Sequence, residues 1–257
     1  QYKQMLKEFG IWYPGVWEET MEELQFSPPL KKAKEQILSL SQYQGFRGKE
    51  CKISVDVATF HKGEWNTIIG KNGAGKSTLL ESIRKLLKTK GDLEYYGENF
   101  EEEITFVFQN PEFQFVTLSV EEEVAYTLKN KGIPEEEITS RVAHLLETFQ
   151  LTHVRSKHPF ELSTGQKRRL SVASAVVHQP SVLLLDEPTF GQDCKNTFSM
   201  LYWLQQLKEA GVCIIMVTHD THIVDHFADQ ILVVDDGELI KVIKKERERK
   251  NAMVVTT

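Results

Sequence analysis

Long apolar runs, cysteines and excess positive charge are all scarce in this chain of 257 residues. No apolar stretch approaches the ~18–20 residues that a bilayer crossing requires, so the chain is not expected to form a membrane pore itself. Its three cysteines, Cys51, Cys194 and Cys213, include no Cys-x-x-Cys pair, which argues against a zinc cluster or a disulfide scaffold. A net charge of −6 argues against a surface that binds nucleic acid.

What the chain does contain is a glycine-rich loop of the form G-x-x-x-x-G-K-S at residues 70–77. An apolar run typical of a buried strand precedes it at 65–69, and apolar residues at helical spacing follow it over 79–87. This order turns backbone N–H groups and the positive end of a helix toward a phosphate. Lys76 can neutralise the β and γ phosphates of a nucleotide, and Ser77 can ligate Mg²⁺. The expected nucleotide contacts of the loop are Asn72, Gly73, Gly75, Lys76, Ser77 and Thr78.

Two adjacent carboxylates, Asp186 and Glu187, end a second apolar run at 182–185. The run predicts a buried strand, and ligands of open α/β sheets bind at the carboxyl ends of such strands. Asp186 is a candidate Mg²⁺ ligand, acting through water, because a hard divalent ion prefers oxygen ligands and keeps several waters. Glu187 is the candidate group that accepts a proton from the water attacking the γ-phosphate, or orients that water.

A third motif, Leu162-Ser163-Thr164-Gly165-Gln166, lies between these two. With it, the chain resembles an ATP-binding cassette (ABC) ATPase, whose signature sequence has this form and this place. Further matches follow in the order of the family: Gln109 after an apolar run, Asp193 after Glu187, and His219 after the apolar run 213–217. The resemblance covers residues 37–243. It implies an α/β fold, a P-loop NTPase of ABC type, with a mostly parallel RecA-like core sheet, an antiparallel β layer and an inserted helical subdomain at about 116–165.

The resemblance also implies that the chain binds and hydrolyses ATP with Mg²⁺, and it gives further residues their roles. Gln109 completes the Mg²⁺ shell and lies on the loop that senses the membrane partner, while His219 contacts the γ-phosphate and helps to fix the attacking water. Ser163 and Gly165 would meet the ATP held by a second nucleotide-binding domain, so hydrolysis requires two cassettes in a closed sandwich. Gln166 and Asp193 complete the expected nucleotide contacts.

Two positions depart from the family pattern, and one expected residue is open to choice. Thr164 stands where the usual signature has its first glycine, and its β-branched side chain narrows the backbone choices, which predicts slower turnover of the composite site. Gln192 stands where leucine is commoner.

An aromatic residue that stacks on adenine is expected before the phosphate loop; Tyr43 is the first candidate and Phe46 the second.

Within the family, segments 109–115 and 119–125 resemble the ATPases of energy-coupling-factor (ECF) transporters, modular importers of vitamins and of nickel or cobalt ions. This implies an ATPase at the cytoplasmic face of the membrane, held there peripherally. Its partners would be a transmembrane coupling protein and a solute-binding membrane protein. The second cassette could be an identical chain, a homologue or the other half of a tandem protein. A soluble ABC ATPase acting on ribosomes, or another non-transport ABC ATPase, is the alternative.

Composition divides the chain into three parts. Residues 1–36 carry prolines, tryptophans and a Glu-rich stretch, and they form either an extension that packs on the cassette or an inter-domain linker. Because residue 1 is Gln and not Met, we favour the second half of a tandem cassette protein. The nucleotide-binding domain follows at 37–243. Residues 244–257 are predicted to be a charged, solvated tail.

Overall fold

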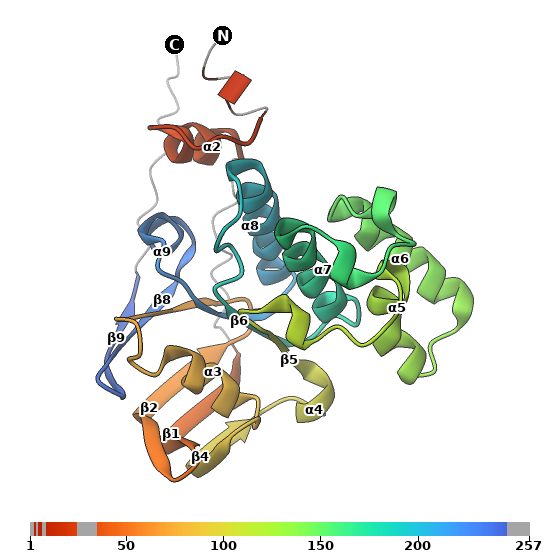
Figure 1. Cartoon of the computed structure of the whole chain (residues 1–257). Helices are drawn as coiled ribbons and strands as arrows, with labels where there is room; N and C mark the ends of the chain where they lie inside the picture. Colours follow the sequence, from red (N-terminus) through yellow and green to blue (C-terminus); the bar gives the residue numbers. More distant parts are fainter. Residues whose placement is uncertain (1–2, 4, 7–8, 25–34, 246–257) are drawn as a thin grey trace, which may run out of the picture.

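A nine-stranded mixed sheet forms the centre of the computed structural model, which describes residues 3, 5–6, 9–24 and 35–245 (Figure 1). The strand order is β4-β1-β2-β9-β8-β3-β7-β6-β5. The strands are β1 (Gln36–Arg47), β2 (Glu50–His61), β3 (Trp65–Ile69), β4 (Lys88–Tyr95), β5 (Ile104–Val107), β6 (Val182–Asp186), β7 (Cys213–Val217), β8 (Gln230–Asp235) and β9 (Glu238–Lys244). The helices are α2 (Val16–Leu24), α3 (Lys76–Ile83), α4 (Phe100–Glu103), α5 (Val120–Asn130), α6 (Glu135–Thr148), α7 (Thr164–Val176), α8 (Cys194–Glu209) and α9 (Thr221–Phe227).

Strands β8, β3, β7, β6 and β5 are parallel and form the core of the sheet. Side chains of a strand alternate between its two faces, and in β6 both faces are buried. Leu183 and Leu185 pack in one apolar cluster with α7 and α8, whereas Val182 and Leu184 pack in a second cluster with α3 and the first strands. The core is thus covered on both sides, and the carboxyl ends of its strands remain at one edge.

An antiparallel layer, β4-β1-β2, extends the sheet beyond this core. It joins the core through β9, which pairs with β2 at Ser54 and Glu238 and runs antiparallel to β8. Asp236 and Gly237 connect β8 to β9 with positive φ values of 44° and 78°, as a tight hairpin turn requires. The Asp-Gly dipeptide thus forms the turn of a hairpin between β8 and β9.

A helical region separates β5 from β6 in the sequence and lies to one side of the sheet (Figure 1). Helices α5 and α6 bury their apolar stripes against α7 in a shared cluster, and Gly132 and Pro134 lie in the turn between them. In the described part of the chain, none of the helices has the length and apolar character to span a membrane. Residues 25–34 of the predicted linker and 246–257 of the predicted tail lie outside the described residues.

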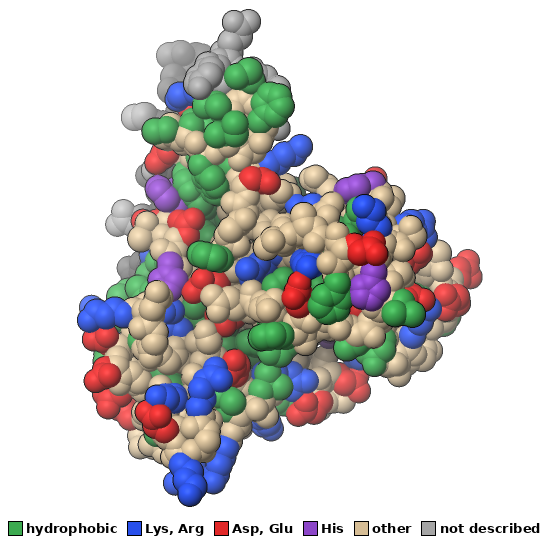
Figure 2. Space-filling view, viewed as in Figure 1, with side chains coloured by type: hydrophobic (Ala, Val, Ile, Leu, Met, Phe, Trp, Pro, Cys, Tyr) green, Lys and Arg blue, Asp and Glu red, His purple; other side chains and the backbone are tan. Residues whose placement is uncertain are grey.

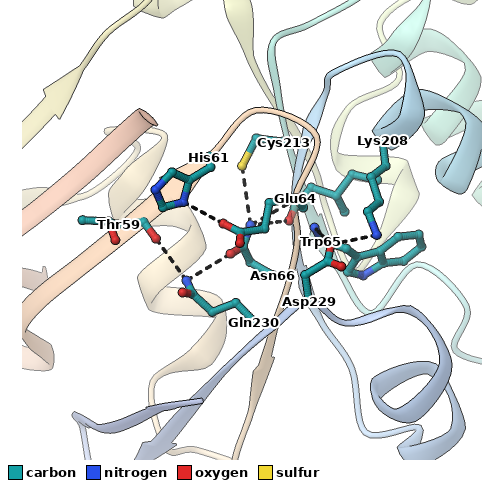
Figure 3. A network of polar contacts seen from close by, with 10 residues as sticks. Thr59, His61, Glu64, Trp65, Asn66, Lys208, Cys213, Asp229 and Gln230 are labelled. Carbon is teal, nitrogen blue, oxygen red and sulfur yellow. Dashed lines mark hydrogen bonds and ion pairs between the residues drawn. The ribbon is translucent and has the colours of Figure 1, made fainter. Parts of the chain in front are cut away.

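A network of buried polar side chains lies at the amino end of the core strands, opposite the carboxyl edge (Figure 3). Lys208 at the end of α8 forms an ion pair with Asp229, with 2.7 Å between Nζ and Oδ2. Asp229 Oδ2 also accepts a hydrogen bond from the backbone N–H of Trp65 at 2.9 Å. Asn66 donates to the carbonyl oxygen of Ile214 at 3.1 Å and accepts from Gln230 at 3.0 Å. These contacts fix the register of the strands that deliver the candidate site.

His178, just before β6, should make the free energy of unfolding depend on pH. Its Nε2 lies 3.0 Å from Thr105 Oγ1, and burial lowers the pKa of this imidazole from 6.5 to about 4. The unfolded chain takes up the proton first, so the free energy of unfolding falls as the pH drops from the unfolded pKa toward the folded one. When the pH is lowered from 7 to about 4.5, the free energy of unfolding should fall by about 2–3 kcal/mol more in the wild-type chain than in His178→Gln. Urea unfolding at each pH measures this difference. Parallel pH profiles of the two proteins would contradict this assignment.

Candidate active site

The phosphate loop connects β3 to α3, as the motif predicts. Gly75 has φ +104°, and a Cβ there would lie 2.5 Å from the carbonyl oxygen of Lys52, so only glycine fits. The Nζ of Lys76 donates to the carbonyl oxygens of Gly70 at 2.9 Å and of Lys71 at 2.8 Å. Burial lowers the pKa of Lys76. The loop therefore curls around its own lysine and holds the ammonium group beside the helix N-terminus.

A cleft of about 520 Å³ opens over this loop at the carboxyl edge of the sheet. Its volume falls within the range of small-molecule sites. The predicted site residues that line it are Asn72, Gly73, Gly75, Lys76, Ser77, Thr78, Gln109, Glu187 and His219. The structure thus brings the phosphate loop together with residues from the ends of three other core strands.

Glu187 lies at the centre of the polar groups that face the phosphate loop. Its Oε1 is 3.3 Å from His219 Nε2, and its Oε2 accepts from Gln109 Nε2 at 3.4 Å. The backbone of Glu187 is left-handed, with φ +48°, and its N–H donates to the carbonyl oxygen of Val217 at 3.1 Å. Strained backbone of this kind is concentrated at functional sites. The carboxylate is held half-buried, where it can accept a proton from a water in the cleft.

Asp186 lies behind the cleft and is 4% exposed. Its Oδ1 is buried with no hydrogen-bond partner among the described residues, and burial raises the pKa of its carboxyl group although Ser77 hydrogen-bonds to it. An unpaired buried carboxylate oxygen next to a serine hydroxyl is a donor set that suits a hard cation. With the amide of Gln109 at the mouth, the residues present fit Mg²⁺.

The signature residues lie away from this cleft, at the start of α7. Ser163 caps the helix: its Oγ accepts from the N–H of Gln166 at 3.3 Å, and the Gln166 side chain accepts from the N–H of Ser163 at 3.0 Å. Ser163 is exposed and Gly165 and Gln166 are half-buried. Asp193 caps α8 through the N–H of Asn196 at 2.8 Å. None of these four predicted nucleotide contacts lines the cleft of its own chain.

Tyr43 does not reach the cleft, and its assignment to adenine stacking is wrong. The side chain is 1% exposed, and its hydroxyl donates to the carbonyl oxygen of Ser82 at 2.7 Å inside the core. A positive φ of 46° at Gln42 and a register shift between β1 and β4 direct this part of β1 inward. Phe46, the second candidate, is half-buried beneath Lys90 and also does not line the cleft.

Four residues around the cleft were not predicted from the sequence. Arg47, Lys52 and Phe190 line it. Arg47 donates to Thr78 Oγ1 at 3.2 Å and to Glu81 Oε2 at 2.6 Å, which fixes its guanidinium group beside α3. Arg168 is buried and donates to the carbonyl oxygen of Glu187 at 3.0 Å. The one feature of the sequence that could have indicated Arg168 is its place two residues after Gln166, in the helix that begins at the signature.

Comparison with known proteins agrees with this geometry. The ABC transporter family matches residues 55–190. A Bacillus subtilis protein, YkoD, described provisionally as an HMP/thiamine import ATP-binding protein, is 36% identical over 92% of this chain and 47% of its own length. The energy-coupling factor transporter ATP-binding protein EcfA1 of Streptococcus pyogenes is 38% identical over 73% of this chain and 71% of its own length. The chain spans less than half the length of YkoD and of several other curated relatives.

A solved structure supports the same assignment. The ATP-binding cassette MJ0796, determined as a dimer in a post-hydrolysis state with ADP and Pi, superposes with a TM-score of 0.72 at 26% identity, over 81% of this chain and 98% of its own. The predicted α/β fold of P-loop NTPases of ABC type is confirmed. Taken with the cleft around Lys76 and Glu187, these matches show that the chain belongs to the ABC transporter family and carries its ATP-hydrolysing cassette.

Proposed function

We propose that this cassette energises solute uptake through a membrane transporter complex of the ECF type. The observation that carries the proposal is the similarity to the S. pyogenes energy-coupling factor ATP-binding protein over most of the length of that protein. The similarity to YkoD, a protein with a provisional import role, points the same way. The transported solute, a vitamin or a metal ion, is recognised by a different polypeptide.

The residues of the cleft have different roles in ATP hydrolysis. Lys76 and the N–H groups of the phosphate loop hold the β and γ phosphates, and Ser77, Asp186 and Gln109 hold Mg²⁺. When bound, Mg²⁺ supplies positive charge to the phosphate oxygens. Glu187 accepts the proton of the water that attacks the γ-phosphorus, the bond from that phosphorus to the β-γ bridging oxygen breaks, and ADP is the leaving group. His219, 3.3 Å from Glu187, holds the γ-phosphate and the attacking water in line.

A second cassette completes the site in this proposal. Ser163, Gly165 and Gln166 lie outside their own cleft, at a surface that a second nucleotide-binding domain can reach. The dimeric structure of MJ0796 with ADP and Pi supports this arrangement. Binding of two ATP molecules between the cassettes would close them, and hydrolysis followed by phosphate release would let them part. The partner is an identical chain, a homologue or the other half of a tandem protein.

An apolar edge beside Gln109 is the proposed docking surface for the transmembrane coupling protein. Phe113, Val116 and Leu118 are 74%, 65% and 76% exposed. The buried carboxylate of Glu123 shapes this loop, because its Oε2 accepts from the N–H groups of Val116 and Thr117, each at 3.0 Å. Large apolar side chains presented together on a rigid loop mark an interaction site. Docking there would place the cassette peripherally on the cytoplasmic face of the membrane.

Replacing Phe113 and Leu118 with Ser should abolish recovery of the membrane subunits, because these two side chains supply the exposed apolar contact. ATP hydrolysis by the isolated protein should stay within about twofold of the wild type, since neither residue lines the cleft. The measurement is co-purification from detergent-solubilised membranes, with ATPase activity measured in parallel. The matched control is Val57→Ser with Ile240→Ser, which removes two exposed apolar side chains from strands β2 and β9. Loss of complex in the control as well would contradict the proposed docking surface.

The whole proposal is tested by purifying the full-length protein from its source membranes through a tag on this chain. Recovery of a small solute-binding membrane protein together with a coupling membrane protein would support ECF-type import and identify the solute system. Recovery of ribosomes without a membrane protein would overturn the transport proposal. That result would favour the alternative of a soluble ABC ATPase and leave the ATPase assignment intact.

A further inference from the structure

Residues 9–24, here called the strap, pack against the segment that leaves β6 and against helices α8 and α9 (Figure 1). The carbonyl oxygen of Gly10 accepts from the N–H of Cys194 at 3.0 Å. The indole N–H of Trp12 donates to the carbonyl oxygen of Gln192 at 3.3 Å. Gly10 has φ +71°, a conformation that favours glycine, and a Cβ there would lie only 3.1 Å from Asp193 Oδ1. The strap therefore holds the backbone of 192–194 from outside.

An aromatic cluster fixes the strap at both helices. Trp17 is 5% exposed and meets Phe198 of α8 edge-on, with 4.7 Å between ring centroids. It also stacks on Trp12 within the strap at 6.1 Å, and on the rings of His222 and His226 of α9 at 5.1 and 5.9 Å. Such pairs add to the free energy of apolar burial. Hydrophobic side chains gather over this end of the molecule, at the top of Figure 2. The strap thus joins two helices that are distant in the sequence.

Each of these helices begins close behind a candidate catalytic residue. Helix α8 follows the loop 187–193, which starts at Glu187, and α9 starts shortly after His219. The side chains of Glu187 and His219 meet at 3.3 Å in the cleft. The strap does not line the cleft, so it can act on this pair only by positioning the two segments that carry them.

Gln192 extends the same loop to the signature. Its side chain is 8% exposed, and neither amide atom has a hydrogen-bond partner in the described part of the chain. Its Oε1 lies 3.4 Å from the position that a Cβ on Gly165 would take. Burying an amide without hydrogen-bond partners costs free energy, so the side chain of Gln192 does not stabilise its own position. The backbone contact with Trp12 holds it in place.

We propose that the strap positions the loop 187–193 for ATP hydrolysis, with Trp12 as a positioning residue that acts through Gln192 on both Glu187 and the signature. This inference rests on the proposed hydrolytic function of the cleft. One end of the loop carries the group that accepts the proton in this chain's site. The other end places the Gln192 side chain beside Gly165 of the signature, which serves the ATP of the second cassette. A fixed loop therefore couples the two composite sites. The strap, which precedes the cassette in the sequence, sets the rate of ATP hydrolysis at both.

The test compares Trp12→Phe with the wild type in the full-length protein and its membrane complex. Phenylalanine keeps a ring against Trp17 and Phe198 but removes the N–H donor to Gln192. We expect kcat to fall roughly tenfold while KM for MgATP is unchanged, because the loop is misplaced but the phosphate loop is intact. Trp203→Phe is the matched control: it removes an indole from α8 that packs on Phe149 instead of the strap. Its kcat should match the wild type.

Hydrogen exchange across residues 187–198 gives a readout independent of turnover. In Trp12→Phe these amides should exchange faster, with the rest of the cassette and the melting temperature unchanged. Unchanged exchange in this segment, or faster exchange without a fall in kcat, would overturn the positioning role. A fall in both kcat and melting temperature would also overturn it, since that indicates general destabilisation. A wild-type protein without ATPase activity would refute the proposed function. Hydrogen exchange of residues 187–198 in the two proteins would then still show whether Trp12 stabilises this segment.

Discussion

Replacing Glu187 with Gln should slow ATP hydrolysis by about 10³-fold while ATP still binds. The amide is isosteric with the carboxylate and keeps its contacts, but it cannot accept a proton from the attacking water. Lys76 and the phosphate loop are untouched, so affinity for MgATP should be retained. Because the bound ATP is not consumed, the two cassettes should remain closed. Single-turnover hydrolysis and size-exclusion chromatography with MgATP measure the two effects separately.

The control for this variant is Glu81→Gln. Glu81 lies on α3, pairs with Arg47 and does not line the cleft, so the variant removes a nearby negative charge without removing the proton acceptor. Its turnover should stay within about tenfold of the wild type. Turnover of Glu187→Gln near the wild-type rate would remove Glu187 from the role of proton acceptor. Equal losses in the two variants would show that negative charge near the cleft matters more than its position.

The parts of the site that the sequence predicts are those formed by short, continuous segments. The glycine-rich loop must lie between a buried strand and a helix, and the structure has β3 and α3 on either side of it. Asp186, Glu187 and His219 each follow an apolar run, and parallel strands deliver their ends to one edge of the sheet. The burial of these strands needs no long-range information, because short, mostly apolar runs are typical of the strands of a parallel sheet, whereas the order of the strands depends on contacts between distant segments.

The parts that could not be predicted depend on contacts between distant segments. Tyr43 was assigned to the cleft by its distance from the phosphate loop, but the positive φ of Gln42 and the associated register shift turn it into the core. No residue type marks that irregularity in advance. Arg168 reaches the carbonyl oxygen of Glu187 only because α7 packs beside β6. The contact of Trp12 with Gln192 joins residues 180 positions apart, and nothing in the sequence around Trp12 indicates it.

The buried polar network at the opposite end of the sheet predicts the largest effect on stability (Figure 3). Lys208 and Asp229 have side chains that are 3% and 8% exposed, with 2.7 Å between Nζ and Oδ2. Their mutual attraction offsets the cost of removing two charges from water. Lys208→Met removes one partner and leaves the Asp229 carboxylate buried without its counter-charge. The free energy of unfolding should fall by about 3–5 kcal/mol, a large part of the ~5–15 kcal/mol that holds a typical domain folded.

A double substitution separates the uncompensated charge from lost packing. In Lys208→Met with Asp229→Asn both charges of the pair are removed, and the Asn side-chain oxygen can still accept the hydrogen bond that the backbone N–H of Trp65 gives to Asp229. This protein should therefore recover most of the stability that Lys208→Met loses. Urea unfolding of the two single variants, the double variant and the wild type gives the coupling energy directly. Lys195→Met, an exposed lysine on the same helix, is the matched control and should change stability by less than about 0.5 kcal/mol. A double variant as unstable as Lys208→Met would show that the loss of stability does not come from the uncompensated charge of Asp229.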